Sequence, residues 1–163
     1  MTTMPNCTIK GNYAAFEHSS WIAGQAWAAR PFASVEALHA AMLDVVRRAP
    51  RRVQVDFLCA HPELAGREAQ AGTMTTDSVR EQRSAGLDAL TRDEMAEMKR
   101  LNAEYLARHG FPFIIAARRH TKEQIFAELR RRVAGDTGAE FAEAFAQIGT
   151  ITRMRLGALV APH

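Results

Sequence analysis

Three stretches of this sequence carry the same signal for the start of an α-helix: a threonine, then Glu or Gln three residues later, then regularly spaced apolar residues. The pairs are Thr91 with Glu94, Thr121 with Gln124, and Thr137 with Glu140. In such a capping box each side chain accepts a hydrogen bond from the other residue's backbone N–H, which satisfies two amides that a helix leaves unpaired. The pattern predicts helices over 92–109, over 122–134, and from 138 to about Leu156.

The rest of the sequence reads as further helices separated by Pro and Gly. Their predicted starts are Ser19 or Ser20, Ser34, Pro62, and Thr76 or Asp77. The run 53–60, VQVDFLCA, is ambiguous between helix and irregular structure. The run 111–117, FPFIIAA, is predicted to be extended, because Phe111 precedes a proline and the residues are apolar and partly β-branched. The prediction is an all-α, single-domain helical bundle of about seven or eight helices with one short extended FPFI segment.

Composition supports one globular domain spanning residues 1–163. Apolar residues make up 47% and charged residues 24% of the chain, which is typical of a folded domain. No run approaches the roughly 18 apolar residues that a membrane span needs. The N-terminus lacks a basic region followed by an apolar run, so no secretory signal is readable. We therefore expect no membrane partner and a cytoplasmic location.

The positive charge is concentrated in arginine clusters. The net charge is +3 and the sequence pI is about 9.2. The clusters are Arg47-Arg48, Arg51-Arg52, Arg118-Arg119 and Arg130-Arg131-Arg132. They indicate either an anionic partner, such as nucleic acid or a small carboxylate, or solvated helix ends at which cations complement the helix dipole. The clusters lack interleaved aromatic residues and a recognisable reading motif, so we expect no nucleic-acid partner.

Two short stretches carry side chains suited to acid–base chemistry. His61 is followed by Pro62, which restricts the backbone beside an imidazole that titrates near neutral pH; a structural histidine is the alternative. Ser78, Glu81 and Gln82 stand at i, i+3 and i+4, so on a helix they form one polar patch. That patch is either an exposed helix face or, if Glu81 points inward, part of a site.

Two further features are candidates for binding. The extended FPFI segment, residues 111–114, has no apparent sheet partner, so its N–H and C=O groups need other partners. A ligand with amides and carbonyls would supply them, as would helix ends with bound water. Arg155 borders the apolar stripe of the last helix, where it either reaches solvent, forms an ion pair, or holds a carboxylate with its guanidinium fork.

Metal sites are not predicted. Cys59, His61 and Glu63 alternate in a region that is no convincing strand, and His109 and His120 lack motif spacing. Cys59 lies in an apolar run and is expected to be a small core residue. The sequence also lacks a phosphate-binding loop and a GxSxG motif.

Taken together and in order, several motifs resemble the OHCU decarboxylase family, whose enzymes act on 2-oxo-4-hydroxy-4-carboxy-5-ureidoimidazoline (OHCU) in urate breakdown. The motifs are HPELAG (61–66), SVREQRSAGLDAL (78–90), LNAEYLARHGFPFIIAARRHTKEQIFAELRRR (101–132) and IGTITRMRL (148–156). With FEHSSWIAGQAWAARPF (16–32), the resemblance runs from Phe16 to Leu156. Residues 1–15 depart from the family pattern, so the N-terminus is expected to be diverged or poorly ordered.

The resemblance implies an all-α decarboxylase, usually a homodimer, that forms (S)-allantoin from a small-molecule substrate, a ureidoimidazoline carboxylate, without metal or organic cofactor. Carried over by position, the catalytic residues are His61, Glu81 and Arg155. The implied substrate-binding residues are Pro62, Ser78, Gln82, Phe111, Phe113 and Ile114. Two alternatives are a helical binding module that has kept the fold without the activity, and a basic nucleic-acid-binding protein.

Overall fold

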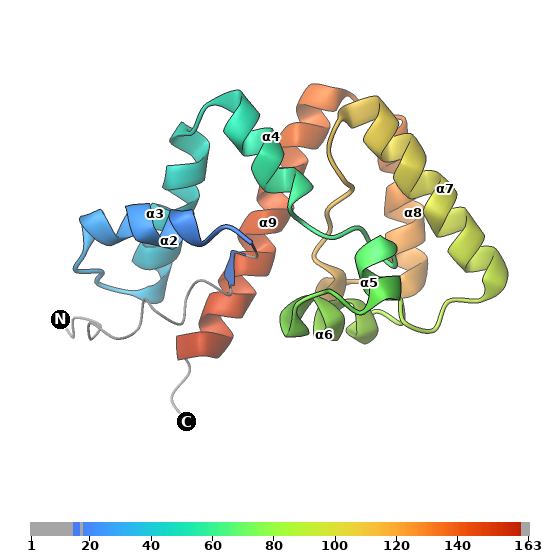
Figure 1. Cartoon of the computed structure of the whole chain (residues 1–163), viewed down its shortest axis with the longest axis horizontal. Helices are drawn as coiled ribbons and strands as arrows, with labels where there is room; N and C mark the ends of the chain where they lie inside the picture. The colour runs from blue at the N-terminus through green and yellow to red at the C-terminus, as the bar shows by residue number, and fades with distance from the viewer. Residues whose placement is uncertain (1–14, 17, 161–163) are drawn as a thin grey trace. The chain divides into compact units, whose positions relative to one another are not determined.

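The structure is a computed structural model that describes residues 15, 16 and 18–160 of the chain. Nearly all of the N-terminal stretch 1–15 that was expected to diverge therefore lies outside the described residues. Within the described part the chain forms eight α-helices and two short 3-10 helices, and no strand (Figure 1). In chain order these are α2 (Ser20–Ala26), η2 (Trp27–Ala29), α3 (Val35–Arg48), α4 (Arg51–Cys59), α5 (Arg67–Ala71), α6 (Thr76–Ser84), α7 (Arg92–His109), η3 (Ala117–Arg119), α8 (Lys122–Val133) and α9 (Thr137–Val160). The all-α prediction with seven or eight helices is confirmed.

The described chain divides into two compact units. The first holds the residues up to Ala60 together with those from Gly149 onward, and the second holds His61–Ile148. The helix α9 contributes its N-terminal half to the second unit and its C-terminal half to the first.

The first unit is built on α2, α3 and α4. The helix start predicted at Ser34 is present, because Ser34 caps α3 by accepting a hydrogen bond from the Ala37 N–H at 3.1 Å, and Leu38, Met42 and Val46 are fully buried. The ambiguous run 53–60 is mostly helix, because it continues α4. Cys59 is exposed, so its expected place in the core is wrong.

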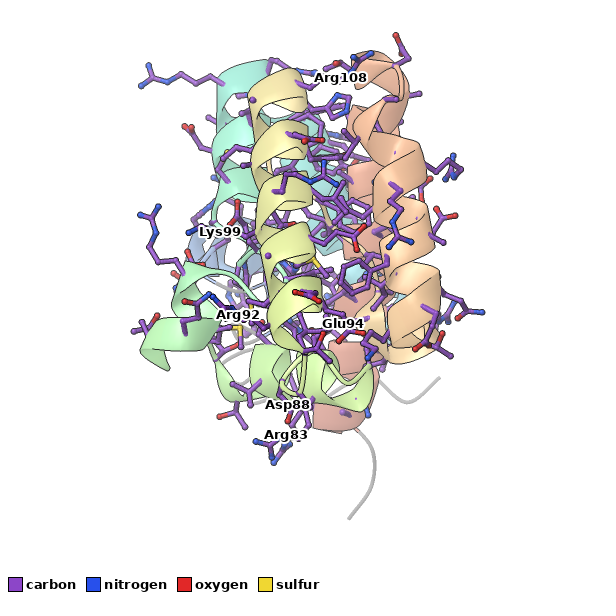
Figure 2. The ribbon with its side chains drawn as sticks, turned by 90° about the vertical axis from the view of Figure 1, so that its right-hand side faces the viewer. Arg83, Asp88, Arg92, Glu94, Lys99 and Arg108 are labelled. Atoms are coloured by element: carbon purple, nitrogen blue, oxygen red, sulfur yellow. The ribbon has the colours of Figure 1, made fainter. Side chains whose placement is uncertain are left out.

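In the second unit, α7 and α8 pack together and begin at the capping boxes that the sequence predicts. Both boxes, at Thr91 and Thr121, have their two reciprocal hydrogen bonds. The inward faces carry regularly spaced apolar residues, and the outward face of α7 carries charged ones such as Arg92, Lys99 and Arg108 (Figure 2). Apolar burial of this kind is the main favourable term in folding.

The third predicted capping box is wrong. The side chain of Asp136 caps α9, accepting a hydrogen bond from the Ala139 N–H at 2.9 Å. Glu140 is buried and pairs with Arg132 instead, at 2.8 Å. A buried guanidinium needs a counter-charge, and this requirement outweighs the local cap that the Thr137–Glu140 spacing offers.

Candidate functional site

The helix α6 buries a polar face. Thr75 caps it by accepting a hydrogen bond from the Ser78 N–H at 3.3 Å. The side chains that it turns inward belong to Ser78, Glu81 and Gln82, which are 2%, 7% and 6% exposed. A helix of a globular protein normally buries its apolar stripe, since burying a carboxylate or an amide is unfavourable without partners. The alternative that this patch is an exposed helix face is therefore wrong.

The loop that follows His61 and Pro62 is held by buried amide side chains. Gln82 of α6 accepts a hydrogen bond from the Ala65 N–H at 2.8 Å, and its Nε2 donates to the Glu63 carbonyl at 3.3 Å. Because Gln82 lies on α6, these bonds tie the loop carrying the histidine to the helix carrying Glu81. Gln82 was expected to contact substrate, and both ends of its amide are engaged with the protein.

A second amide secures the same loop from α7. Asn102, itself buried, donates from Nδ2 to the Leu64 carbonyl at 3.0 Å. Just before these anchored residues, Pro62 is buried and His61 is partly exposed. Ala65 has a φ of 47°, a left-handed conformation that side-chain-bearing residues seldom adopt. The surrounding hydrogen bonds hold it there.

Burial also changes the electrostatics of this loop. Glu63, two residues beyond His61, is partly buried, and burial raises the pKa of its carboxyl above the ordinary value, with a further contribution from Glu68. Gly66 fits against it, because a Cβ at that position would lie 2.7 Å from the Glu63 Cβ. Position 66 therefore has no room for a larger side chain unless Glu63 shifts.

The FPFI segment is buried and lies outside any helix or strand. Residues 111–117 are all buried, and the segment leads into η3, which packs on α6. One backbone group of the segment and one just after it bond to protein side chains. The Ile114 carbonyl accepts from Arg132 Nη1 at 3.1 Å, and the Ala116 N–H donates to Gln147 Oε1 at 2.9 Å. The partners include side chains from α8 and α9, which the sequence did not indicate.

Sequence reasoning missed Arg132, Asn102 and Gln147 as residues that shape the site. Arg132 was grouped with its two neighbours as a possible solvated helix end, yet it is fully buried. A signal was present, because Arg132 lies seven residues after Ile125 and so falls on the apolar face of α8. Asn102 likewise sits among the buried positions of α7. A polar residue on an apolar stripe is the feature to look for.

Arg155 belongs to the first unit, where it is buried on α9. One turn before it, Thr152 forms a hydrogen bond with His39 of α3 at 2.8 Å. Burial, followed by the nearby Arg153, lowers the pKa of His39. The other predicted site residues lie in the second unit. No group of three metal-ligating side chains comes together among the described residues, and no described helix is long and apolar enough to cross a bilayer.

The described residues form an all-α protein in which a buried polar helix face is tied to a histidine-bearing loop and accompanied by a buried irregular segment. The sequence profile of the OHCU decarboxylase family matches residues 10–157. The chain belongs to the OHCU decarboxylase family.

Several relatives carry names from urate degradation. The chain is 42% identical over 145 residues to the uric acid degradation bifunctional protein PucL of Bacillus subtilis (strain 168), covering 89% of this chain and 28% of that protein. It is 38% identical over 142 residues to the 2-oxo-4-hydroxy-4-carboxy-5-ureidoimidazoline decarboxylase of Mus musculus, covering 87% of this chain and 80% of that one. The chain thus spans less than a third of the bifunctional protein and most of the mouse protein.

Solved structures share the fold. A crystal structure of (S)-allantoin synthase superposes with a TM-score of 0.70 at 28% identity, over 93% of this chain and 49% of that one. A crystal structure of OHCU decarboxylase in the presence of (S)-allantoin superposes with a TM-score of 0.71 at 20% identity, over 90% of this chain and 95% of that one. The second likeness is evidence for the fold alone.

Proposed function

We propose that this protein is a carboxy-lyase that converts OHCU to (S)-allantoin in urate degradation. The observation that carries the proposal is the buried polar face of α6, with Ser78, Glu81 and Gln82, bound through Gln82 to the loop that follows His61. Family membership supplies the reaction, and the burial of these groups supports a site built to hold a polar substrate. A scaffold without activity has no use for a buried carboxylate beside this loop.

The reaction needs little chemistry from the protein. The bond between a ring carbon and the carboxylate carbon breaks, CO₂ leaves, and the electron pair passes toward the adjacent ring C=N. The ring nitrogen that receives the electron pair takes up a proton. The neighbouring hydroxyl then loses its proton and becomes a carbonyl, while a proton adds to one face of the adjacent ring carbon. Because the substrate carries its own electron sink, we propose that no cofactor takes part. The protein orients the bond, keeps water away and controls the protonated face.

We assign acid–base roles to the two groups suited to them. His61 acts on the substrate hydroxyl or the adjacent carboxylate, since an imidazole exchanges protons near neutral pH. Glu81 accepts hydrogen bonds from the ureido or ring nitrogens and is a candidate for the proton transfer. Positioned groups of this kind contribute about 10²–10⁴-fold each to the rate.

The remaining predicted residues serve to bind and orient. Ser78 offers a buried hydroxyl next to Glu81, and Pro62 lines the pocket beside His61. The backbone around Phe111, Phe113 and Ile114 supplies hydrogen bonds to the ureido and ring groups. Gln82 supports the site by holding the histidine-bearing loop, and its direct contact with substrate stays a prediction.

Arg155 is the proposed anion-binding group. A guanidinium presents paired donors that suit a carboxylate or a carbonyl oxygen. The role of Arg155 stays a prediction. The variant Arg155→Lys tests it, because lysine keeps the positive charge but lacks the paired donors of the guanidinium. We expect a raised KM with a normal unfolding temperature. An unchanged KM and kcat would remove Arg155 from the site.

The decisive experiment follows the optical activity of allantoin. Urate, urate oxidase and the hydrolase that forms OHCU are combined with or without this protein, and circular dichroism of the product is recorded over time. We expect optically active (S)-allantoin only when the protein is present, and loss of that signal with folded His61→Asn and Glu81→Ala variants. Racemic product at the spontaneous rate, or both variants with wild-type turnover, contradicts the proposal.

Three further points remain predictions. We propose that the whole chain works as one OHCU decarboxylase-like domain, because the family profile extends over residues of both compact units. A homodimer is expected from the family, and sedimentation equilibrium tests it. A cytoplasmic location is expected from the sequence, and fractionation of the source cells tests it.

A further inference from the structure

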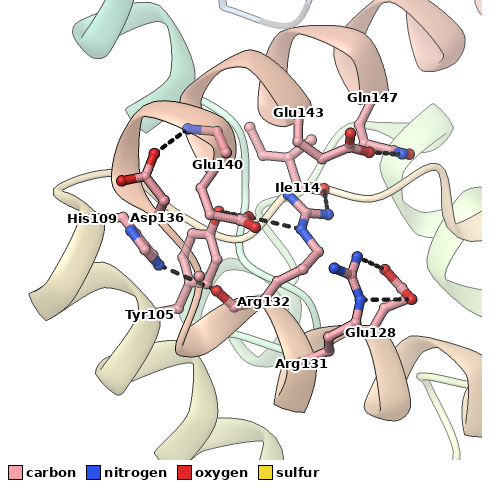
Figure 3. Close-up of polar contacts among 12 residues, drawn as sticks. Tyr105, His109, Ile114, Glu128, Arg131, Arg132, Asp136, Glu140, Glu143 and Gln147 are labelled. Atoms are coloured by element: carbon pink, nitrogen blue, oxygen red, sulfur yellow. Dashed lines mark hydrogen bonds and ion pairs between the residues drawn. The ribbon is translucent and has the colours of Figure 1, made fainter.

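One arginine of the RRR cluster is buried, and it is linked to the proposed substrate-binding segment. Arg132, in the last turn of α8, is 1% exposed and forms an ion pair from Nε to Glu140 Oε2 at 2.8 Å. Tyr105 of α7 donates from its hydroxyl to the same carboxylate oxygen at 2.7 Å. Figure 3 shows Arg132 between this carboxylate and Ile114. The three side chains form a buried polar triad.

The guanidinium of Arg132 makes two separate contacts with the FPFI segment. Its Nη1 donates to the Ile114 carbonyl at 3.1 Å, and its central carbon lies 4.6 Å from the centre of the Phe113 ring. The hydrogen bond fixes the distance between Arg132 and the Ile114 carbonyl. Stacking against Phe113 fixes the plane of that ring relative to the guanidinium. Together they set both the position and the orientation of the segment.

The triad is itself held from several directions. The backbone carbonyl of Arg132 accepts a hydrogen bond from His109 Nε2 at 3.3 Å, and the other ring nitrogen of His109 bonds to the Thr137 hydroxyl at 2.9 Å. The turn between α8 and α9 closes tightly over Glu140, since a Cβ on Gly135 would lie 3.0 Å from its Oε1. Burial, then the bond to Glu140, raises the pKa of Tyr105, so its hydroxyl remains a donor.

Stability alone does not account for this arrangement. Buried ion pairs are often no more stabilising than apolar side chains of similar size, because both charges lose their hydration. Arg132 also leaves its Nη2, which is buried, without a hydrogen-bond partner among the described residues. An apolar side chain would fill this place without an unpaired donor. What it would not supply is the bond to the Ile114 carbonyl.

We propose that Arg132 is a positioning residue for decarboxylation: held by Glu140 and Tyr105, it fixes the backbone of the FPFI segment in the geometry that binds substrate. The inference rests on the proposed function for the role of that segment. It adds a part of the site that touches no reacting atom and acts through Ile114 and Phe113.

The test replaces the triad as a unit. In Arg132→Met/Glu140→Leu/Tyr105→Phe both charges and the hydroxyl are removed together, so no buried charge is left unpaired. We expect an unfolding temperature near that of the wild type and a kcat/KM that falls about 10- to 100-fold with a raised KM, as for other small misplacements of a binding group. The matched control is Arg130→Met/Glu97→Gln, which removes a surface ion pair between α8 and α7 and leaves kinetics unchanged.

A second variant guards against failure to fold. Arg132→Lys keeps the charge opposite Glu140 and reaches fewer of the three groups that the guanidinium contacts, so we expect an intermediate loss, at least about fivefold in kcat/KM. Wild-type kcat and KM in either folded variant, with the surface-pair control also unchanged, overturns the proposal.

A measurement without substrate separates this inference from the proposed function. Hydrogen exchange, followed by mass spectrometry, reports opening of the peptide covering 111–116. We expect faster exchange there in the triple variant and in Arg132→Lys than in the control. If the wild type makes no (S)-allantoin and exchange still rises, the positioning holds and the assigned reaction fails. Unchanged exchange in that peptide overturns the positioning itself.

Discussion

The helices α6 and α8 lie in the same unit and both begin at a threonine cap, yet they bury opposite kinds of face. The inward side of α8 carries Ile125, Phe126 and Leu129, with Arg132 at its end. The inward side of α6 carries only Ser78, Glu81 and Gln82. Burial of apolar area stabilises a fold, whereas burial of a carboxylate does not. The comparison separates a helix whose buried face is apolar from one whose buried face is polar, as the proposed site requires.

Substitution on the polar face of α6 should give the largest effect on activity, without a comparable change in stability. Glu81→Gln keeps the size of the side chain and removes the negative charge. We expect kcat/KM to fall by about 10²–10⁴-fold, since a positioned acid–base group contributes that much. The unfolding temperature should change little, because glutamine has nearly the same size and keeps a polar side chain at this position. Allantoin formation and thermal unfolding are measured together.

The control for this substitution is Glu104→Gln on α7, which removes an exposed carboxylate paired with Arg100. It should change neither quantity. If Glu81→Gln unfolds the protein while the exchange at Glu104 does not, the α6 carboxylate is a structural group and the contrast between the two helices is lost.

Truncation on the apolar face of α8 should lower stability and leave activity nearly unchanged. Leu129→Ala deletes a fully buried side chain of α8, which costs about 2–5 kcal/mol in the free energy of unfolding. We expect the kcat of the remaining folded protein to change little. Leu106→Ala, on the exposed side of α7, is the matched control and should cost less than about 0.5 kcal/mol. A large loss of kcat in folded Leu129→Ala would contradict the division of roles.

The sequence predicts the helices that bury an apolar face well. Threonine caps, periodic apolar residues and the left-handed Gly110 that ends α7 are local signals. They locate α7 and α8 almost to the residue. Local signals fail where a contact with a residue elsewhere in the sequence determines the position of a side chain. Glu140 has the spacing of a capping residue, but the charge of Arg132 draws it inward, and Asp136 caps α9 instead.

The candidate site is predictable only in part for the same reason. The spacing of Ser78, Glu81 and Gln82 places them on one helix face, and it does not say whether that face is buried. The motif order identifies the family, so His61 and Glu81 are named as candidates without any geometry, and their roles stay a prediction. The amides of Gln82 and Asn102 that hold the histidine-bearing loop depend on contacts across 17 and 38 residues, which no local pattern contains.

Removing an anchor of the histidine-bearing loop should have an intermediate effect on both activity and stability. Asn102→Ala leaves the Leu64 carbonyl without this donor, and an unsatisfied buried acceptor costs about 1–3 kcal/mol. We also expect kcat to fall, because the loop carries His61. Gln70→Ala is the control: its bond to the Ala65 carbonyl is longer, 3.5 Å, and more exposed, so both losses should be small. Equal effects of the two variants would contradict anchoring from α7.

A smaller, pH-dependent effect is expected at Glu63. Burial raises the pKa of this carboxyl in the folded state, so folding favours its protonated form. Its destabilising contribution is therefore absent at pH values below the unfolded pKa and fully present above the folded pKa. Glu63→Gln should raise the unfolding temperature at pH 7 and leave it unchanged near pH 3. A larger gain at pH 3 than at pH 7 would reverse the sign and contradict burial as the cause.

The smallest effect is expected on the outward face of α8, directly beside Arg132. Arg131 pairs with Glu128 one turn away, and the two side chains are 67% and 37% exposed. Exposed pairs contribute about 0–1 kcal/mol, because water already solvates both charges and salt screens their attraction. Arg131→Gln should therefore leave the free energy of unfolding within about 0.5 kcal/mol and kcat/KM unchanged. Urea unfolding and the allantoin assay check both. Since Arg131 and Arg132 are adjacent and identical in type, a loss of activity in Arg131→Gln as large as that in Arg132→Lys would mean that charge on this helix matters and burial against Ile114 does not.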